Sequence, residues 1–81
     1  MYTSFNIYYD LAKKYFEHFK NLSVPRSFRT FDGINFDENG FPLGHFIANQ
    51  RYSYNYDEEY PMDRYNKLND IAMNWSVNKR W

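Results

Sequence analysis

The sequence lacks cysteine, has only three glycines and three prolines, and carries no excess charge of either sign. Without cysteine, the chain has neither a disulfide framework nor a thiolate ligand for a metal. No apolar run approaches the roughly 20 residues of a membrane-spanning helix. The first stretch, MYTSFNIYYDLAKK, lacks the basic start and apolar block of a signal peptide. We therefore expect a cytoplasmic protein with no membrane partner.

The balance of charge argues against a strong electrostatic nucleic-acid binder, because such proteins usually carry a clear basic excess. Ten basic residues oppose ten acidic residues, which gives a net charge of zero. The two signs are nevertheless segregated along the chain. Residues 1–31 hold five basic and two acidic residues, whereas residues 32–70 hold three basic and eight acidic residues. One face of the folded chain can therefore still be basic.

Motifs associated with catalysis are absent from the sequence. It contains neither the GxxxxGK[ST] loop that holds a triphosphate nor the GxSxG turn that exposes a nucleophilic serine. His18 and His45 fall on different predicted helices and fit solvated surface residues better than metal ligands. The acidic run at 57–59 fits stabilisation of the next helix N-terminus better than a pair of acid–base carboxylates. We expect no catalytic site, no cofactor and no metal.

Aromatic residues make up 23% of the chain and supply what a small core needs. Each buried ring removes about 150–250 Å² from water, so a few rings stabilise a chain whose length alone makes it marginal. Apolar residues at helical spacing predict helices over about 4–20, 42–54 and 61–73. Between the first two helices, DG and NG turns and four phenylalanines indicate an ordered loop or a short hairpin.

These patterns predict an all-α fold, namely a small three-helix bundle with a long aromatic-rich ordered loop between the first and second helices. Pro42 suits the first turn of the second helix, since its missing N–H would have no helical partner there. We expect residues 1–81 to form a single domain that is a fragment of a longer protein.

The stretch LGHFIANQRYSYNY, residues 43–56, carries the least expected polar residues of the chain. On a helix, Gln50 falls near the centre of the apolar face and Arg51 lies on its flank. We interpret Gln50 as structural, with its amide bonded to the long loop. Arg51 suits a phosphate or a carboxylate equally well. Tyr52 and Trp81 lie off the apolar faces, and Tyr52 is either an ordinary surface residue or a stacking platform for a base.

Taken in order, several short elements resemble the bacterial helicase-associated domain, a module found C-terminal to superfamily 2 helicase cores, often in tandem copies. The matching elements are Val24-Pro25, Asp32-Gly33, Asn39-Gly40, Leu43-Gly44-His45-Phe46-Ile47, Gln50-Arg51, Asp63-Arg64, Leu68, Ile71 and Trp75. Phe5 and Phe46 stand where the family pattern has tryptophan, and Lys20 and Ala72 stand where it has glycine. The resemblance covers residues 5–75.

The resemblance implies a non-catalytic accessory domain of a DNA or RNA helicase, with nucleic acid and the helicase core of the parent chain as partners. We expect DNA rather than RNA, contact through the phosphate backbone, and a monomeric isolated domain. The alternative is a protein–protein docking module that uses exposed tyrosines and the acidic run at 57–59. The candidate nucleic-acid contacts are Arg51, Lys13, Lys20, Arg26, Arg29 and Tyr52, with Gln50 as a positioning residue.

Overall fold

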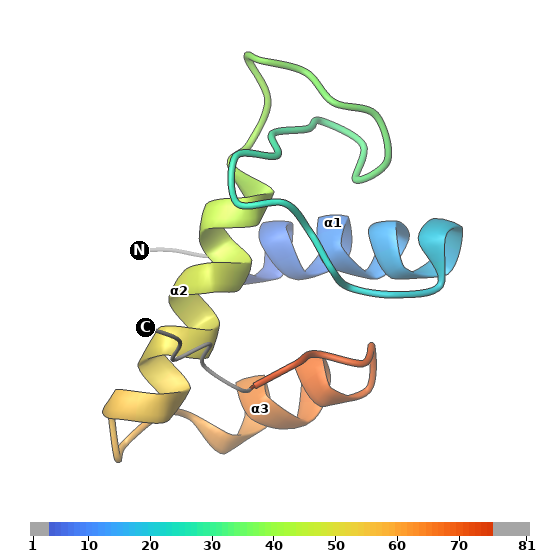
Figure 1. The fold of residues 1–81 in the computed structure, drawn as a ribbon. Coiled ribbons are helices and arrows are strands. Elements are labelled where there is room, and N and C mark those ends of the chain that lie inside the picture. The colour runs from blue at the N-terminus through green and yellow to red at the C-terminus, as the bar shows by residue number, and fades with distance from the viewer. Residues whose placement is uncertain (1–3, 76–81) are drawn as a thin grey trace, which may run out of the picture.

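The computed structural model describes residues 4–75, and three helices form its frame (Figure 1). Helix α1 spans Ser4–Phe19, α2 spans Leu43–Tyr56 and α3 spans Met62–Asn69. Figure 1 shows α1 and α3 extending to the same side of α2, with the long loop running from the end of α1 back to the beginning of α2. Within residues 4–75 there is no strand, which confirms the predicted all-α fold.

The third helix ends four residues before the predicted boundary because the chain turns through a left-handed cap. Ala72 has a φ of 64°. Its N–H donates to the carbonyl of Asn69, and the N–H of Met73 donates to the carbonyl of Leu68, both at 3.2 Å. This pair of bonds is the Schellman motif, in which a residue with positive φ closes a helix. The buried side chains of Leu68 and Met73 join the core on either side of the turn.

The first helix ends in a simpler left-handed cap. Lys20 has a φ of 65°, and its N–H donates to the carbonyl of Phe16 at 2.7 Å. The resemblance to the helicase-associated domain implies glycine at Lys20 and at Ala72. Both helices therefore end in a left-handed residue that carries a Cβ, which costs about 1–2 kcal/mol of conformational free energy at each position.

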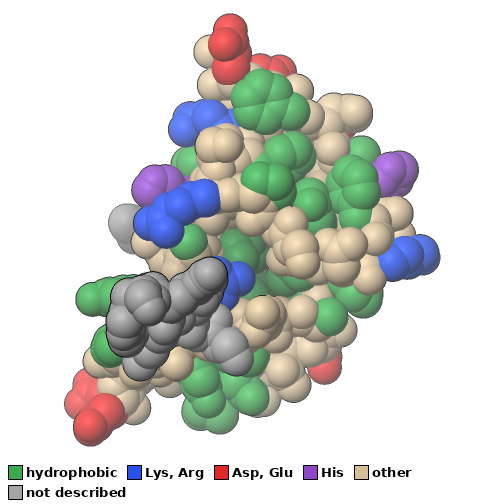
Figure 2. All heavy atoms as spheres, in the orientation of Figure 1, with side chains coloured by type: hydrophobic (Ala, Val, Ile, Leu, Met, Phe, Trp, Pro, Cys, Tyr) green, Lys and Arg blue, Asp and Glu red, His purple; other side chains and the backbone are tan. Residues whose placement is uncertain are grey.

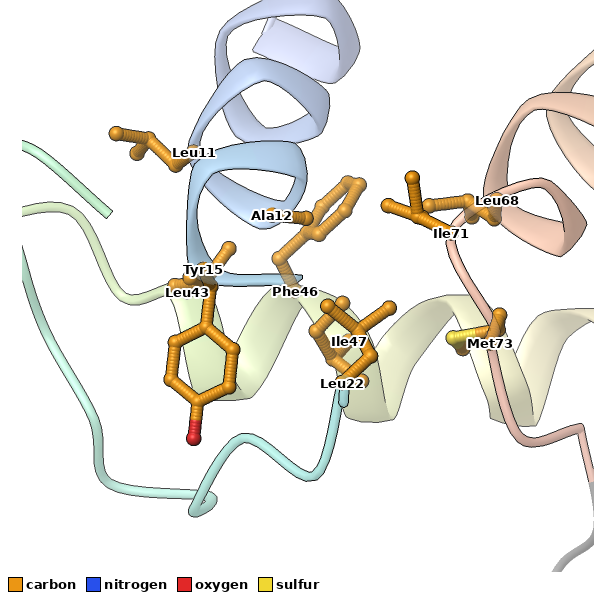
Figure 3. Packing of buried hydrophobic residues seen from close by; sticks show 10 residues of the cluster. All are labelled: Leu11, Ala12, Tyr15, Leu22, Leu43, Phe46, Ile47, Leu68, Ile71 and Met73. Carbon is orange, nitrogen blue, oxygen red and sulfur yellow. The ribbon is translucent and has the colours of Figure 1, made fainter. Parts of the chain in front are cut away.

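The core lies where the three helices and the ends of their loops meet (Figure 3). Phe46 of α2 lies between two rings of α1, with its centroid 5.7 Å from that of Phe5 and 5.0 Å from that of Tyr8. Phe19 shares the helical spacing of the core but is 41% exposed, and its ring lies against Tyr15 at the end of α1. The buried cluster consists of Leu11, Ala12, Tyr15, Leu22, Leu43, Phe46, Ile47, Leu68, Ile71 and Met73.

The loop from 20 to 42 is ordered by polar contacts of its own. Thr30 is fully buried, and its Oγ1 accepts a bond from the N–H of Gly33 at 3.0 Å. The Asp32 carboxylate accepts bonds from the N–H groups of Ile34 and Asn35, each at 2.8 Å. These backbone donors hold the pKa of Asp32 well below its ordinary value of 3.8. Isolated bridges link Thr30 to residues 36 and 41, so the loop is no regular hairpin.

Gly33 seats this loop on the first helix. It has a φ of 86°, and a Cβ at this position would lie 2.6 Å from the carbonyl oxygen of Leu11. The phenylalanine rings of the loop differ in their exposure. Phe28 packs against the core, whereas Phe31 and Phe36 are 56% and 63% exposed. None of the helices within residues 4–75 combines the length and the apolar character that crossing a bilayer requires.

Candidate nucleic-acid interface

Gly44 lets the long loop wrap closely around the first turn of α2. A Cβ at this position would lie 1.9 Å from the carbonyl oxygen of Pro25 and 2.5 Å from that of Arg26. The N–H of Gly44 also donates to the carbonyl of Phe28 at 3.0 Å. Because real Cβ atoms do not approach backbone this closely, only glycine allows residues 25–28 to reach the helix here.

This close approach brings two arginines of the loop to the first turn of α2. Arg26, Ser27, Arg29, Pro42 and His45 line one open hollow of about 520 Å³. Both arginines are exposed, and Figure 2 shows Lys or Arg side chains beside a histidine on the left of the view. Each guanidinium offers five N–H donors in a planar fork that matches the oxygens of a phosphate. The hollow is therefore lined by two groups that can donate several hydrogen bonds.

A second hollow continues from the first along α2. It has a volume of about 310 Å³ and is lined by Tyr8, Pro42, His45, Phe46 and Asn49. Pro42 and His45 belong to both hollows. The recessed surface is thus cationic at the beginning of α2 and becomes aromatic and amide-lined further along the helix.

Arg51 lies on another side of α2 and has an intramolecular partner. Its side chain is half-buried, and Nε donates to the carbonyl of Asn74 at 2.8 Å. Asn55 supports the same contact, since its Nδ2 donates to the carbonyl of Trp75 at 2.6 Å. At about 100° per residue, Arg51 stands about 120° around the helix from His45. Arg51 therefore ties the segment after α3 to α2, apart from the hollow of Arg26 and Arg29.

Gln50 bonds a buried tyrosine in the connection between α2 and α3. Its Oε1 accepts a bond from the Tyr60 hydroxyl, and the Tyr60 side chain is buried. Burial raises the pKa of Tyr60, because the ionised phenolate loses hydration there; nearby Arg64 opposes this shift and Asp63 adds to it. The amide of Gln50 thus serves the turn that leads to α3, rather than the long loop that we expected from the sequence.

The remaining candidates do not join the hollow of Arg26 and Arg29. Lys13 on α1 and Lys20 directly after α1 are exposed, and neither lines this hollow. Tyr52 is 62% exposed on the outer side of α2. Trp81, the other ring that lies off the apolar faces, is outside the described residues. Of the six candidate contacts, the fold brings Arg26 and Arg29 into one hollow.

Two further cations are used between helices. The Arg64 guanidinium lies 4.7 Å from the centroid of the Phe5 ring, and the Lys67 ammonium lies 5.8 Å from that of Tyr9. These cation–π contacts join α3 to α1, and sequence reasoning missed them. The sequence spacing is compatible with these contacts. Arg64 and Lys67 are three residues apart on one side of α3, and their partner rings are four residues apart on one side of α1.

The acidic run at 57–59 belongs to the end of α2. Asp57 follows the last residue of α2, and its Oδ1 accepts a bond from the N–H of Glu59 at 2.9 Å. The Asp57 carboxylate thus closes the turn that follows α2, and stabilisation of the next helix N-terminus by the acidic run stays a prediction. Within residues 4–75, no three His, Asp or Glu side chains gather as metal ligands would.

His45 also lines this hollow, although sequence reasoning placed it on the surface without a role. It stands in the first turn of α2, next to the glycine that admits the loop. A histidine beside a glycine in a first helical turn is a weak signal by itself. Its meaning depends on the two arginines, which come from 19 and 16 residues earlier in the sequence.

Comparison with known proteins supports the sequence pattern. The helicase associated domain family matches residues 3–76, a range that contains all three helices. No curated protein and no solved structure matches the chain. The chain therefore belongs to the helicase-associated domain family.

Proposed function

We propose that this chain is a non-catalytic accessory domain of a helicase and binds the phosphate backbone of nucleic acid through Arg26 and Arg29. The observation that carries the proposal is their convergence with His45 on one hollow at the beginning of α2. None of the five residues that line this hollow is acidic. Two guanidinium groups without a competing carboxylate in the hollow suit a phosphate, because each can donate two parallel hydrogen bonds to it.

Zero net charge is compatible with this function because no acidic residue lines the hollow itself. Few phosphate contacts give weak affinity with a shallow dependence on salt, since counterion release scales with the number of phosphates neutralised. Tandem copies of the domain or the helicase core would raise the effective concentration and convert weak contacts into useful avidity. We assign DNA as the preferred nucleic acid and the helicase core of a parent chain as the second partner.

The other candidates take lesser parts in this proposal. Lys13 and Lys20 add a diffuse positive potential from α1, which attracts nucleic acid without fixing its position. Arg51 belongs to the scaffold, because its Nε already holds the carbonyl of Asn74. Gln50 positions Tyr60 and thereby the connection to α3.

The test compares two double variants that remove the same charge. Arg26→Ala with Arg29→Ala removes both guanidinium groups from the hollow. Lys13→Ala with Lys20→Ala removes two exposed cations elsewhere, one on α1 and one directly after it. Binding to a fluorescent DNA would be measured by anisotropy over a range of salt concentrations. The arginine variant should bind about tenfold more weakly and lower the salt slope by roughly 1–2. An equal loss in both variants would show a net-charge effect and contradict the hollow as the site.

Protein docking is the second candidate function, and the exposed rings of the long loop favour it. Phe31 and Phe36 are 56% and 63% exposed, and contact with a partner would remove both rings from water. These rings would dock against the helicase core of the parent chain. Phe31→Ser with Phe36→Ser should then weaken association with an added helicase core and leave DNA binding unchanged. The reverse pattern would remove docking as a function of this loop.

A further inference from the structure

The outer side of α2 carries four exposed side chains in one row. His45, Asn49, Tyr52 and Tyr56 recur at intervals of four, three and four residues, so they fall within an arc of about 60°. All four are exposed, and they lie opposite the buried side of α2. The two tyrosines are 62% and 56% exposed, and their ring centroids are 4.6 Å apart. We call this row the outer row of α2.

The outer row begins at the cationic hollow. His45 lines the hollow that contains Arg26 and Arg29, and His45 and Asn49 line the second hollow. With a rise of about 1.5 Å per residue, Tyr52 lies about 10 Å further along the helix than His45. Phosphate-binding side chains and exposed rings therefore follow one another on a single side of the molecule.

We propose that Tyr52 and Tyr56 form a stacking platform for the bases of a single-stranded nucleic acid whose phosphates bind in the hollow of Arg26 and Arg29. This inference rests on the proposed function and extends it to the kind of strand that is bound. Exposed rings beside a cationic groove are how proteins bind single strands without sequence preference, because every base has a face that can stack.

The charges at the two ends of α2 differ, so the phosphates and the bases of the strand are expected at different ends of the outer row. Arginines stand at its beginning, and acidic residues 57–59 follow directly after Tyr56. The acidic turn repels phosphates, so the backbone of the strand is held near Arg26 and Arg29 while its terminal bases reach the tyrosines. A duplex gains less from this arrangement, since its bases are already paired and stacked on one another.

The decisive experiment follows ring protons of the 81-residue chain by NMR during titration with oligothymidylate and, separately, with a DNA duplex. Stacked bases should shift the ring protons of Tyr52 and Tyr56 upfield in the single-strand titration alone. The variant Tyr52→Leu with Tyr56→Leu should bind oligothymidylate about tenfold more weakly and bind duplex as before. Tyr52→Phe with Tyr56→Phe keeps both rings and should keep the affinity.

The outcomes separate this inference from the function on which it rests. Unchanged affinity of the leucine variant, together with a loss in the arginine variant, would overturn the stacking platform and leave phosphate binding intact. Absence of binding by the unmodified chain at low salt would overturn both. Shifts of the tyrosine rings that depend on protein concentration, and not on DNA, would overturn the platform and assign the outer row to contact between proteins.

Discussion

The four arginines within residues 4–75 lie in two regions with different surroundings. Arg26 and Arg29 come from the long loop, are exposed, and line a hollow at the beginning of α2. Arg51 and Arg64 come from helices and are half-buried, and each contacts a group of the same chain. One bonds the carbonyl of Asn74, and the other lies over the ring of Phe5.

The surroundings of an arginine, rather than its presence in the sequence, decide whether its guanidinium group has a partner within the fold. Arg51 and Arg64 stand on helices that pack against other parts of the chain. Their guanidinium groups therefore contact groups of the same chain, namely the carbonyl of Asn74 and the ring of Phe5. The loop holds Arg26 and Arg29 by its backbone alone, through the contacts of residues 25–28 with Gly44. Their side chains are left available for a ligand.

The largest effect should come from Gly44→Ala, which attacks the close approach that forms the hollow. The new Cβ would meet the backbone of Pro25 and Arg26, neither of which can yield as a flexible side chain could. We expect a loss of about 3 kcal/mol in the free energy of unfolding, measured by urea denaturation. DNA affinity should fall as well, because the loop is displaced together with its arginines.

A control on an exposed helical position is available for this change. Asn66→Ala lies on the exposed side of α3 and should alter the free energy of unfolding by less than about 0.5 kcal/mol. A fully stable Gly44→Ala variant would show that the loop does not depend on this contact.

The next largest effect should come from replacing one arginine of each region by alanine. Arg51→Ala removes the bond to the carbonyl of Asn74, so the free energy of unfolding should fall by about 1–2 kcal/mol. DNA affinity of the folded fraction should stay the same. Arg29→Ala should show the opposite pattern, with normal stability and weaker binding. If Arg51→Ala left stability unchanged and weakened binding, the division between the two regions would be lost.

A smaller and stabilising effect should follow from Ala72→Gly. Ala72 holds a positive φ in the turn that leads from α3 to Asn74, and glycine adopts this conformation without the Cβ penalty. We expect the free energy of unfolding to rise by about 1 kcal/mol, seen as a higher midpoint of thermal unfolding. Lys20→Gly should behave alike at the end of α1. DNA affinity should be unaffected by Ala72→Gly, since this turn does not line the hollow of Arg26 and Arg29.

Acid should separate the two regions by releasing the long loop first. The pKa of Asp32 in the fold lies below 3.8, so its stabilising bonds are complete at neutral pH. They weaken as the pH falls from about 3.8 toward the lower pKa of the folded state. The amide signals of Ile34 and Asn35 should move in this range before those of residues 74 and 75. Asp32→Asn should remove this pH dependence, and simultaneous movement of both regions would contradict it.

Periodicity sufficed to predict the three helices, because their apolar residues recur at the spacing that a helix requires. It missed the early end of α3, since an alanine in a left-handed cap gives no signal comparable to a glycine. The partner of Arg51 was beyond reach for another reason. The carbonyl of Asn74 comes to α2 only through the turn at 70–73, and any residue type could supply that carbonyl.

The candidate site shows the same limit of local reasoning. The segregation of charge identified Arg26 and Arg29 as candidates but could not separate them from Lys13 and Lys20. Their convergence depends on how closely the loop approaches Gly44, which is a tertiary contact without a periodic pattern. Residue spacing within one helix is readable from sequence, whereas convergence of a loop on a helix follows from packing.

Binding of nucleic acid at Arg26 and Arg29 can be tested by an amide-shift titration of the 81-residue chain with a short single-stranded DNA, at low and moderate salt. We expect shifts concentrated at residues 25–29 and 44–45 that fade as salt rises, with residues 51 and 74–75 nearly unchanged. Shifts concentrated at Arg51 and the segment after α3, or no shifts at low salt, would show that the hollow of Arg26 and Arg29 is not the binding site.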